Sequence, residues 1–207
     1  MCRRKTDVPL QNRADPFGQL HAVSERGQMM GNRGGRFHLP GRVLGRRRWA
    51  SRQWIACVCQ FRGRQRQVWG QGYTELFFLD EVTALASGHR PCFECRRADA
   101  LAFRDCFDAG GMRAGAMDLV LHAERLARPR PALLAYDDLP DGAMLAIGDA
   151  AFAIRDGRWL RWSFDGYHAT ESPDPLERAI LLTPPSIVAA LRRGYRPAWY
   201  SGKRHLV

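Results

Sequence analysis

The chain has 207 residues, including 32 Lys or Arg and 21 Asp or Glu, so its formal net charge is +11. This length allows one domain with a sizeable core or two smaller domains. We expect no membrane span, because there is no long apolar run, and no signal peptide, because the start is polar and basic. Six cysteines are too few for a disulfide scaffold. Reduced thiols, a metal site and a cytoplasmic location are therefore expected.

The positive charge is concentrated in one stretch of the chain. Between Glu25 and Glu75 there is no Asp or Glu, whereas eleven arginines occur there. Codon usage in a GC-rich genome explains why only Lys5 and Lys203 are lysines, but it does not explain the missing acids. A surface of one sign attracts polyanions, and a guanidinium can bind phosphate through two parallel hydrogen bonds. The stretch predicts contact with a polyanion such as nucleic acid. The expected partner is DNA more than RNA.

Residues 1–48 carry no sustained apolar period and are rich in Gly, Pro, Asn and Arg. The run GNRGGR at 31–36 could be a flexible basic arm or a backbone nest for an anion. It lacks the Gly-Lys-Ser/Thr ending of a phosphate-binding P-loop. We therefore expect a basic, largely irregular segment.

Residues 54–69 have the pattern of a β-hairpin, with strands at 54–61 and 64–69 joined by Arg62-Gly63. The two-residue period of a strand places Cys57 and Cys59 on one face. They are either small core residues or metal ligands, since cysteine is often buried.

Residues 73–103 read as a strand, a short helix, a tight turn with two cysteines and a second helix. Asp80 can cap the first helix and Gly88 can end it in the left-handed conformation. Cys92 and Cys95 then form a C-x-x-C pair at a turn that enters a helix. Two thiols in this arrangement can bind one tetrahedral metal ion, so the pair predicts half of a zinc site.

The sequence ALASGHRPCFEC at 84–95 resembles the second metal half-site of the Ada DNA-alkylation-repair family, whose modules also occur on other nucleic-acid proteins. The resemblance is limited to about residues 73–97. It implies that Cys92 and Cys95 bind zinc and that Gly88, Arg90 and Pro91 shape the turn.

The family takes its first half-site from a segment just upstream, which implies that Cys57 and Cys59 complete the zinc site. The spacing departs from the family, whose first pair lies three residues apart or more, whereas this pair is C-x-C. His38 or His89 could replace a cysteine in a Cys₃His site, although His89 fills an aromatic position that usually packs. The Cys-rich motif that carries the family's methyl-acceptor cysteine is missing, so only zinc binding and affinity for nucleic acid are implied.

A helix is expected at 98–107 and another at 118–127. The second contains His122-Ala123-Glu124. Zinc nucleobase deaminases carry two sequence signatures, H-A-E and P-C-x-x-C. Here the two motifs occur in the reverse order, so only a permuted fold could join them. A histidine on an apolar helix stripe is more often a packing residue.

The last part of the chain predicts short strands between residues 144 and 167, with Asp156-Gly157 as a hairpin turn. A helix follows, with Thr183 as its cap, Pro184 in its first turn and Gly194 at its end. Aromatic side chains on these strands could stack bases, but burial in the core is the commoner use.

Together these patterns predict an α+β fold, in which a zinc-knuckle and β-hairpin module is joined by short helices and a small antiparallel β unit. The expected division is a basic segment at 1–48, the zinc-binding module at 49–128, and a β-rich unit with a C-terminal helix at 129–207.

The leading hypothesis is a nucleic-acid-binding protein stabilised by Zn²⁺, with the ion bound by Cys57, Cys59, Cys92 and Cys95. Phosphate contacts are expected from Arg46, Arg47, Arg48, Arg52, Arg62, Arg64, Arg66, Arg96 and Arg97. One alternative is a zinc-dependent hydrolase, deaminase-like or a nuclease, that uses His122 and Glu124. Another is an interaction module without a metal.

Overall fold

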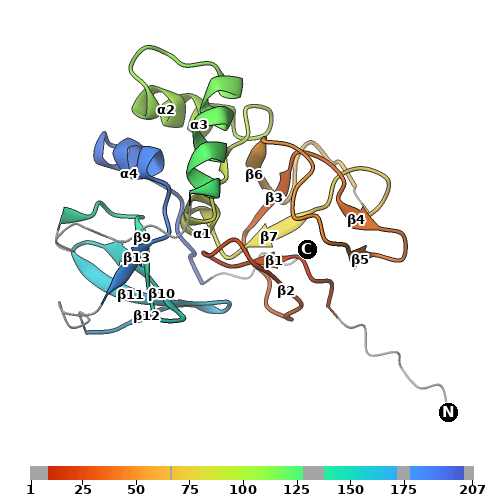
Figure 1. Ribbon diagram of the computed structural model, residues 1–207, viewed down its shortest axis with the longest axis horizontal. Coiled ribbons are helices and arrows are strands. Elements are labelled where there is room, and N and C mark those ends of the chain that lie inside the picture. Colours follow the sequence, from red (N-terminus) through yellow and green to blue (C-terminus); the bar gives the residue numbers. More distant parts are fainter. Residues whose placement is uncertain (1–8, 66, 128–137, 172–177, 203–207) are drawn as a thin grey trace.

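The computed structural model describes residues 9–65, 67–127, 138–171 and 178–202. The fold is α+β, as the sequence predicts, with two main sheets and four helices in the described residues. Helix α1 (Glu81–Ala86) lies between the two sheets, while helices α2 (Arg97–Phe107), α3 (Ala114–Leu126) and α4 (Pro185–Arg192) lie above them in Figure 1. None of the helices in these ranges is long and apolar enough to cross a membrane.

The first sheet has six strands and is built mainly from the N-terminal half of the chain. In spatial order its strands are β2 (Leu20–His21), β1 (Arg13–Ala14), β7 (Leu76–Phe78), β3 (Met29–Arg33), β6 (Trp54–Val58) and β8 (Arg90–Pro91). Strand β3 is antiparallel to both of its neighbours, whereas β6 and β8 are parallel. The parallel pair brings the C-x-x-C turn beside β6.

Strand β3 is a buried strand within residues 1–48, which the sequence predicts to be largely irregular. All five of its residues are buried, and two further short strands, β4 (His38–Leu39) and β5 (Val43–Leu44), follow it. Gly31 is a packing residue, because a Cβ atom there would lie 2.4 Å from the carbonyl oxygen of Ile55 and 2.7 Å from the ring of Phe78. A glycine inside a strand often marks such a close approach. The pairing of β3 with β6 crosses the predicted division at residue 48.

The prediction of a hairpin at 54–69 is wrong. Its turn forms, with positive φ angles of 51° at Arg62 and 66° at Gly63, and the Arg64 N–H donates to the carbonyl of Phe61. Strand β6, however, pairs with β3 on one edge and with β8 on the other. No edge of β6 is left for a returning strand.

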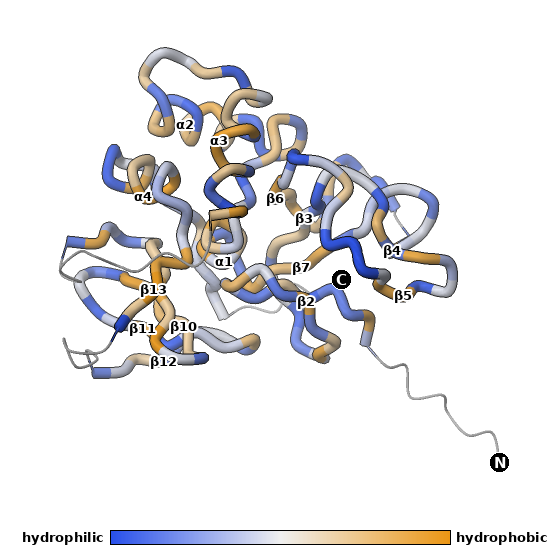
Figure 2. The backbone as a smooth tube through the Cα atoms, viewed as in Figure 1, coloured by the Kyte–Doolittle hydropathy of each residue, from blue (hydrophilic) through white to orange (hydrophobic). Residues whose placement is uncertain are grey.

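The second sheet is an antiparallel meander, as expected for the C-terminal part. Its spatial order is β12 (Gly166–Ala169), β11 (Arg158–Ser163), β10 (Ala150–Arg155), β9 (Met144–Ile147) and β13 (Ala179–Leu181). Asp156 and Gly157 form the predicted turn, with φ angles of 51° and 69°. Hydrophobic residues on one face of this sheet pack with α2, α3 and α4 in one core, whereas those on the other face pack with Val82 and Ala86 of α1 in a second cluster. Figure 2 shows the hydropathy of these elements along the backbone.

The helix ends follow the sequence signals with two exceptions, of which the first is that α3 begins at Ala114, four residues before its predicted start. The Asp80 carboxylate accepts a hydrogen bond from the Thr83 N–H at the start of α1, and Gly88 has a φ of +92° after its end. At α4 the cap is Pro184 and not Thr183. The hydroxyl of Thr183 instead accepts a hydrogen bond from the N–H of Met144, which ties β9 to the chain before α4.

Two buried acidic residues at the start of α1 hold the C-terminal segment. The Asp80 carboxylate accepts hydrogen bonds from the Tyr167 hydroxyl and the Tyr200 N–H. The Glu81 carboxylate accepts from the Tyr195 hydroxyl at 2.6 Å and from the Ala198 N–H at 2.9 Å. Residues 195–200 are thereby fixed to the helix that lies between the sheets.

Asp80 makes the stability of the protein depend on pH. Burial raises the pKa of its carboxyl from 3.8 to about 6, so the folded state binds this proton more tightly than the unfolded state does. The free energy of unfolding should therefore fall by about 3 kcal/mol through this group as the pH rises through that interval. Urea denaturation of the wild type and of Asp80→Asn across these pH values measures the difference. An identical pH dependence of the two proteins would contradict the prediction.

Candidate metal centre

Three cysteines from two distant segments meet beside the edge of the six-stranded sheet. Cys57 lies in β6, Cys92 directly follows β8, and Cys95 lies in the turn before α2. The parallel register pairs Ala56 with Pro91, and the residue that follows each of them in the chain is a cysteine. The Cys92 N–H also donates to the carbonyl of Ala56 at 3.0 Å. All three Sγ atoms lie within 4.8 Å of one another.

Burial and hydrogen bonds determine which of these sulfurs carries negative charge. Cys57 and Cys92 are buried and pack against Met30, while Cys95 is half-buried. The thiols of Cys57 and Cys95 hydrogen-bond to Cys92, which lowers the pKa of Cys92 and raises that of Cys57. The Glu94 N–H also points at the Cys92 sulfur, at 3.4 Å. The protein alone thus favours a single thiolate.

The donor set fits a thiophilic cation. A bound cation offsets the mutual repulsion of thiolates, so it would allow all three cysteines to ionise. Three cysteines supply three of the four positions of a tetrahedral zinc ion. Across the described ranges, these cysteines are the one group of three or more Cys, His, Asp or Glu side chains placed to hold a metal.

Cys59 is not part of this group, which corrects the expected four-thiolate site. Strand β6 ends at Val58, so the alternation that would place Cys59 beside Cys57 stops one residue too early. Cys59 is exposed, and its thiol donates to the carbonyl of Gln28 at 3.5 Å.

Neither of the two histidines considered as substitute ligands joins the centre. The His38 ring contacts the Thr74 hydroxyl through Nδ1 and the Gly70 carbonyl through Nε2, and it stacks on Trp69. The His89 ring is bonded to the Ser87 hydroxyl at 2.8 Å and is fully buried. Both rings therefore act as packing residues, as the resemblance implies for His89.

His122 and Glu124 also lie outside the cysteine group. Residues two apart on a helix point in different directions. The Glu124 carboxylate accepts hydrogen bonds from the N–H and the hydroxyl of Ser186, at the start of α4. The His122 ring instead contacts Trp49 edge to face at 6.2 Å. The pair is not arranged as the proton-transfer group of a zinc site.

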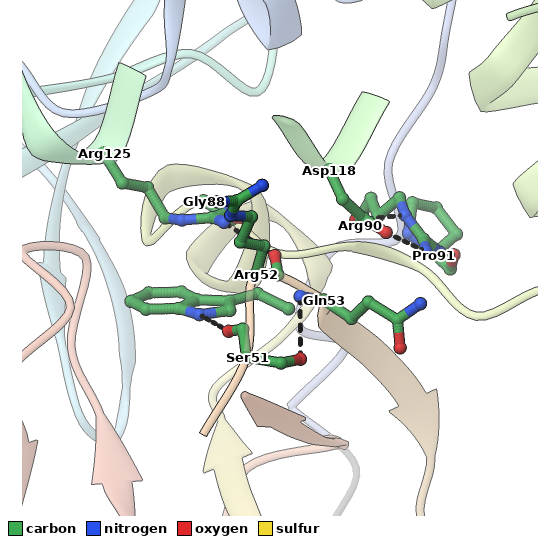
Figure 3. A network of polar contacts seen from close by, with 9 residues as sticks. Ser51, Arg52, Gln53, Gly88, Arg90, Pro91, Asp118 and Arg125 are labelled. Carbon is green, nitrogen blue, oxygen red and sulfur yellow. Dashed lines mark hydrogen bonds and ion pairs between the residues drawn. The ribbon is translucent and has the colours of Figure 1, made fainter. Parts of the chain in front are cut away.

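The structure divides the candidate arginines into buried and exposed ones. Arg96 is buried and forms a bidentate ion pair with Glu81, so its expected contact with phosphate is wrong. Arg90, which the resemblance places in the turn, is likewise buried and paired with Asp118 (Figure 3). Arg66 lies outside the described residues. The remaining candidates are exposed, namely Arg46, Arg47, Arg48, Arg52, Arg62, Arg64 and Arg97.

Two adjoining grooves are lined by arginine-rich segments of the chain between β3 and β7. The larger, about 650 Å³, is lined by Arg36, Arg42 and Arg47 and by the stacked rings of His38 and Trp69. The smaller, about 400 Å³, is formed by residues 46–50 alone. Arg47 lines both grooves. Trp49 in the smaller groove is a site residue that was not predicted, although its position directly after three arginines is a signal for it.

The exposed positive charge of these segments has few acidic neighbours. Of the two acids that bound the acid-free stretch, Glu75 is buried and accepts a hydrogen bond from the Trp69 N–H. Arg64 is an exception, because it forms an exposed ion pair with Glu94 at 2.7 Å.

Comparisons test whether this arrangement is shared with known proteins. Searches against protein-family models, curated proteins and solved structures found no match to the chain. The likeness of residues 84–95 to the Ada family half-site therefore remains a resemblance in sequence. The three cysteines and the two basic grooves are the features of the structure that bear on function.

Proposed function

We propose that the protein binds nucleic acid through phosphate contacts, and that a zinc ion at Cys57, Cys92 and Cys95 stabilises the binding fold. The observation that carries the proposal is the pair of grooves lined by exposed arginines within a stretch that has no acidic residue. Arginine is well suited to phosphate because its planar fork donates two hydrogen bonds at once.

The cysteine centre supports this proposal through its position. Zinc there would join β6 to the turn before α2, and β6 follows directly on the arginine-rich residues 45–53. A metal bound in the folded state alone adds its binding free energy to the stability of the fold. The role of zinc is thus to hold the strand on which the basic surface depends. Of the two nucleic acids, DNA is proposed as the partner ahead of RNA.

Salt titration tests the proposal. Each phosphate contact contributes about −0.9 to the slope of log affinity against log salt for duplex DNA. Replacement of Arg46, Arg47 and Arg48 by alanine should therefore reduce this slope by about 2 to 3. Fluorescence anisotropy with a labelled duplex at several salt concentrations gives the slopes.

A matched triple variant distinguishes the effect of where the arginines lie from the effect of the protein's net charge. Arg113, Arg158 and Arg161 are exposed and lie away from the grooves, so replacing all three removes the same charge. This control should keep a slope close to that of the wild type. Equal losses in both triple variants would show that net charge alone governs binding, and an absence of binding to any polyanion would refute the proposal.

A zinc hydrolase is the second candidate function, because three protein ligands leave one coordination position for water. It is the weaker proposal, since Glu124 is bonded to Ser186 and His122 lies against Trp49. Metal analysis of the purified protein distinguishes both candidates from an interaction module without a metal.

A further inference from the structure

Trp49 has an unusual environment for a tryptophan of this chain. All six tryptophans are among the described residues, and Trp49 is the exposed one, with 40% of its surface accessible. Its two aromatic neighbours meet it at steep angles, 49° for Trp54 and 74° for His122. Neither neighbour stacks face to face on the indole. A flat ligand could therefore lie parallel to this ring.

The loop that carries Trp49, residues 45–53, is held in place from both sides. The carbonyl of Arg33 accepts hydrogen bonds from the N–H groups of Ala50 and Ser51, at 2.8 and 3.2 Å. On the other side, the Arg125 guanidinium donates to the carbonyls of Gly88 and Arg52, both at 2.8 Å (Figure 3).

The ring of Trp54 supports the same loop. The guanidinium of Arg33 lies 3.9 Å from its centre and that of Arg125 lies 4.4 Å from it. Its indole N–H donates to the carbonyl of Ser51 at 3.2 Å. These contacts position the loop before any ligand binds, which lowers the entropic cost of binding.

Positive charge surrounds the exposed ring. Arg46, Arg47 and Arg48 precede it and line the same groove, and the exposed Arg52 follows it. Burial and the nearby Arg125 and Arg52 lower the pKa of the adjacent His122, which disfavours the charged form of its ring. An aromatic face among phosphate-binding side chains is the combination that binds single-stranded nucleic acid, where the backbone meets cations and a base stacks on the ring.

We infer that residues 46–52 form a binding site for single-stranded nucleic acid, in which an unpaired base stacks on Trp49. This inference rests on the proposed function and specifies its ligand. Paired bases in a duplex already stack on one another, so a duplex offers phosphates to this surface but no free base face. The protein should therefore prefer a single strand, although a duplex carries more charge per unit length.

The test uses the full-length protein and three labelled probes: a 15-residue oligothymidylate, a duplex of the same length and a 15-unit abasic strand. Trp49→Ala should bind oligothymidylate about tenfold more weakly than the wild type and should bind the duplex almost unchanged, since stacking contributes only where a base is free. The wild type should bind the abasic strand about as weakly as Trp49→Ala binds oligothymidylate.

Two further variants keep the test decisive. Trp49→Phe retains an aromatic face and should recover most of the affinity, whereas Tyr73→Ala removes an exposed aromatic ring elsewhere and should have no effect. Equal binding of abasic strand and oligothymidylate by the wild type would overturn the inference, even if Trp49→Ala failed to fold. Equal, salt-dependent binding of all three probes would overturn it but leave the proposed function intact. Binding of none would refute both.

Discussion

Serine in place of Cys57, Cys92 or Cys95 is expected to abolish stoichiometric zinc binding. Each substitution removes one of three thiolates that lie within 4.8 Å of one another and leaves the ion with two. When free zinc is 100 times its dissociation constant, binding contributes about 2.7 kcal/mol. For a chain of this size that corresponds to a fall in Tm of about 5–10 °C in the variants. Elemental analysis and thermal unfolding with and without chelator measure both effects.

Two other cysteines provide matched controls for this experiment. Cys59 is exposed and Cys106 lies in α2, so Cys59→Ser and Cys106→Ser should keep their zinc and their response to chelator. Full zinc occupancy in Cys92→Ser, or a wild-type Tm that chelator does not change, would refute the metal centre. Loss of zinc in Cys59→Ser would restore the four-thiolate site that the sequence predicts.

Glu81→Ala is expected to destabilise the fold by about 3–5 kcal/mol, the usual effect of removing one partner of a buried ion pair. Arg96 would then remain buried with only the half-exposed Asp99 as its counter-ion. The Tyr195 hydroxyl and the Ala198 N–H would lose their acceptor as well. Urea denaturation measures the change in the free energy of unfolding.

An exposed ion pair serves as the control for this variant. Arg104 and Asp105 form such a pair at 2.9 Å on α2, and Asp105→Ala should change stability by less than about 1 kcal/mol. The double variant Glu81→Gln with Arg96→Met leaves no buried charge at this position, whereas Arg96→Glu leaves two carboxylates there without their cation. The double variant should therefore be the more stable of the two. A Glu81→Ala variant as stable as Asp105→Ala would contradict the prediction.

Features that depend on a few consecutive residues were predictable from the sequence. The cap at Asp80, the left-handed glycine at position 88 and the Asp156-Gly157 turn are set by local backbone and side-chain chemistry, and the structure contains all three. The same holds for the pairing of Cys92 with Cys95, since three residues across a turn already bring their thiols together.

Features that depend on which strand edges meet were not predictable. The hairpin pattern at 54–69 is locally sound, but β3 and β8 occupy both edges of β6. Burial of β3 depends on the close packing of Gly31 against Phe78, and the amino-acid composition of the segment does not indicate this contact. The prediction that Cys59 binds the metal beside Cys57 was wrong for a related reason. Alternation along a strand does not indicate the residue at which the strand ends.

The attachment of residues 195–200 to the start of α1 has a consequence for biosynthesis. Glu81 receives two of its hydrogen bonds from Tyr195 and Ala198, more than one hundred positions later in the chain. A nascent chain therefore lacks these donors until residues 195–198 have left the ribosome. The contacts that fix residues 195–200 to α1 can accordingly form only after the residues of the N-terminal sheet have been synthesised.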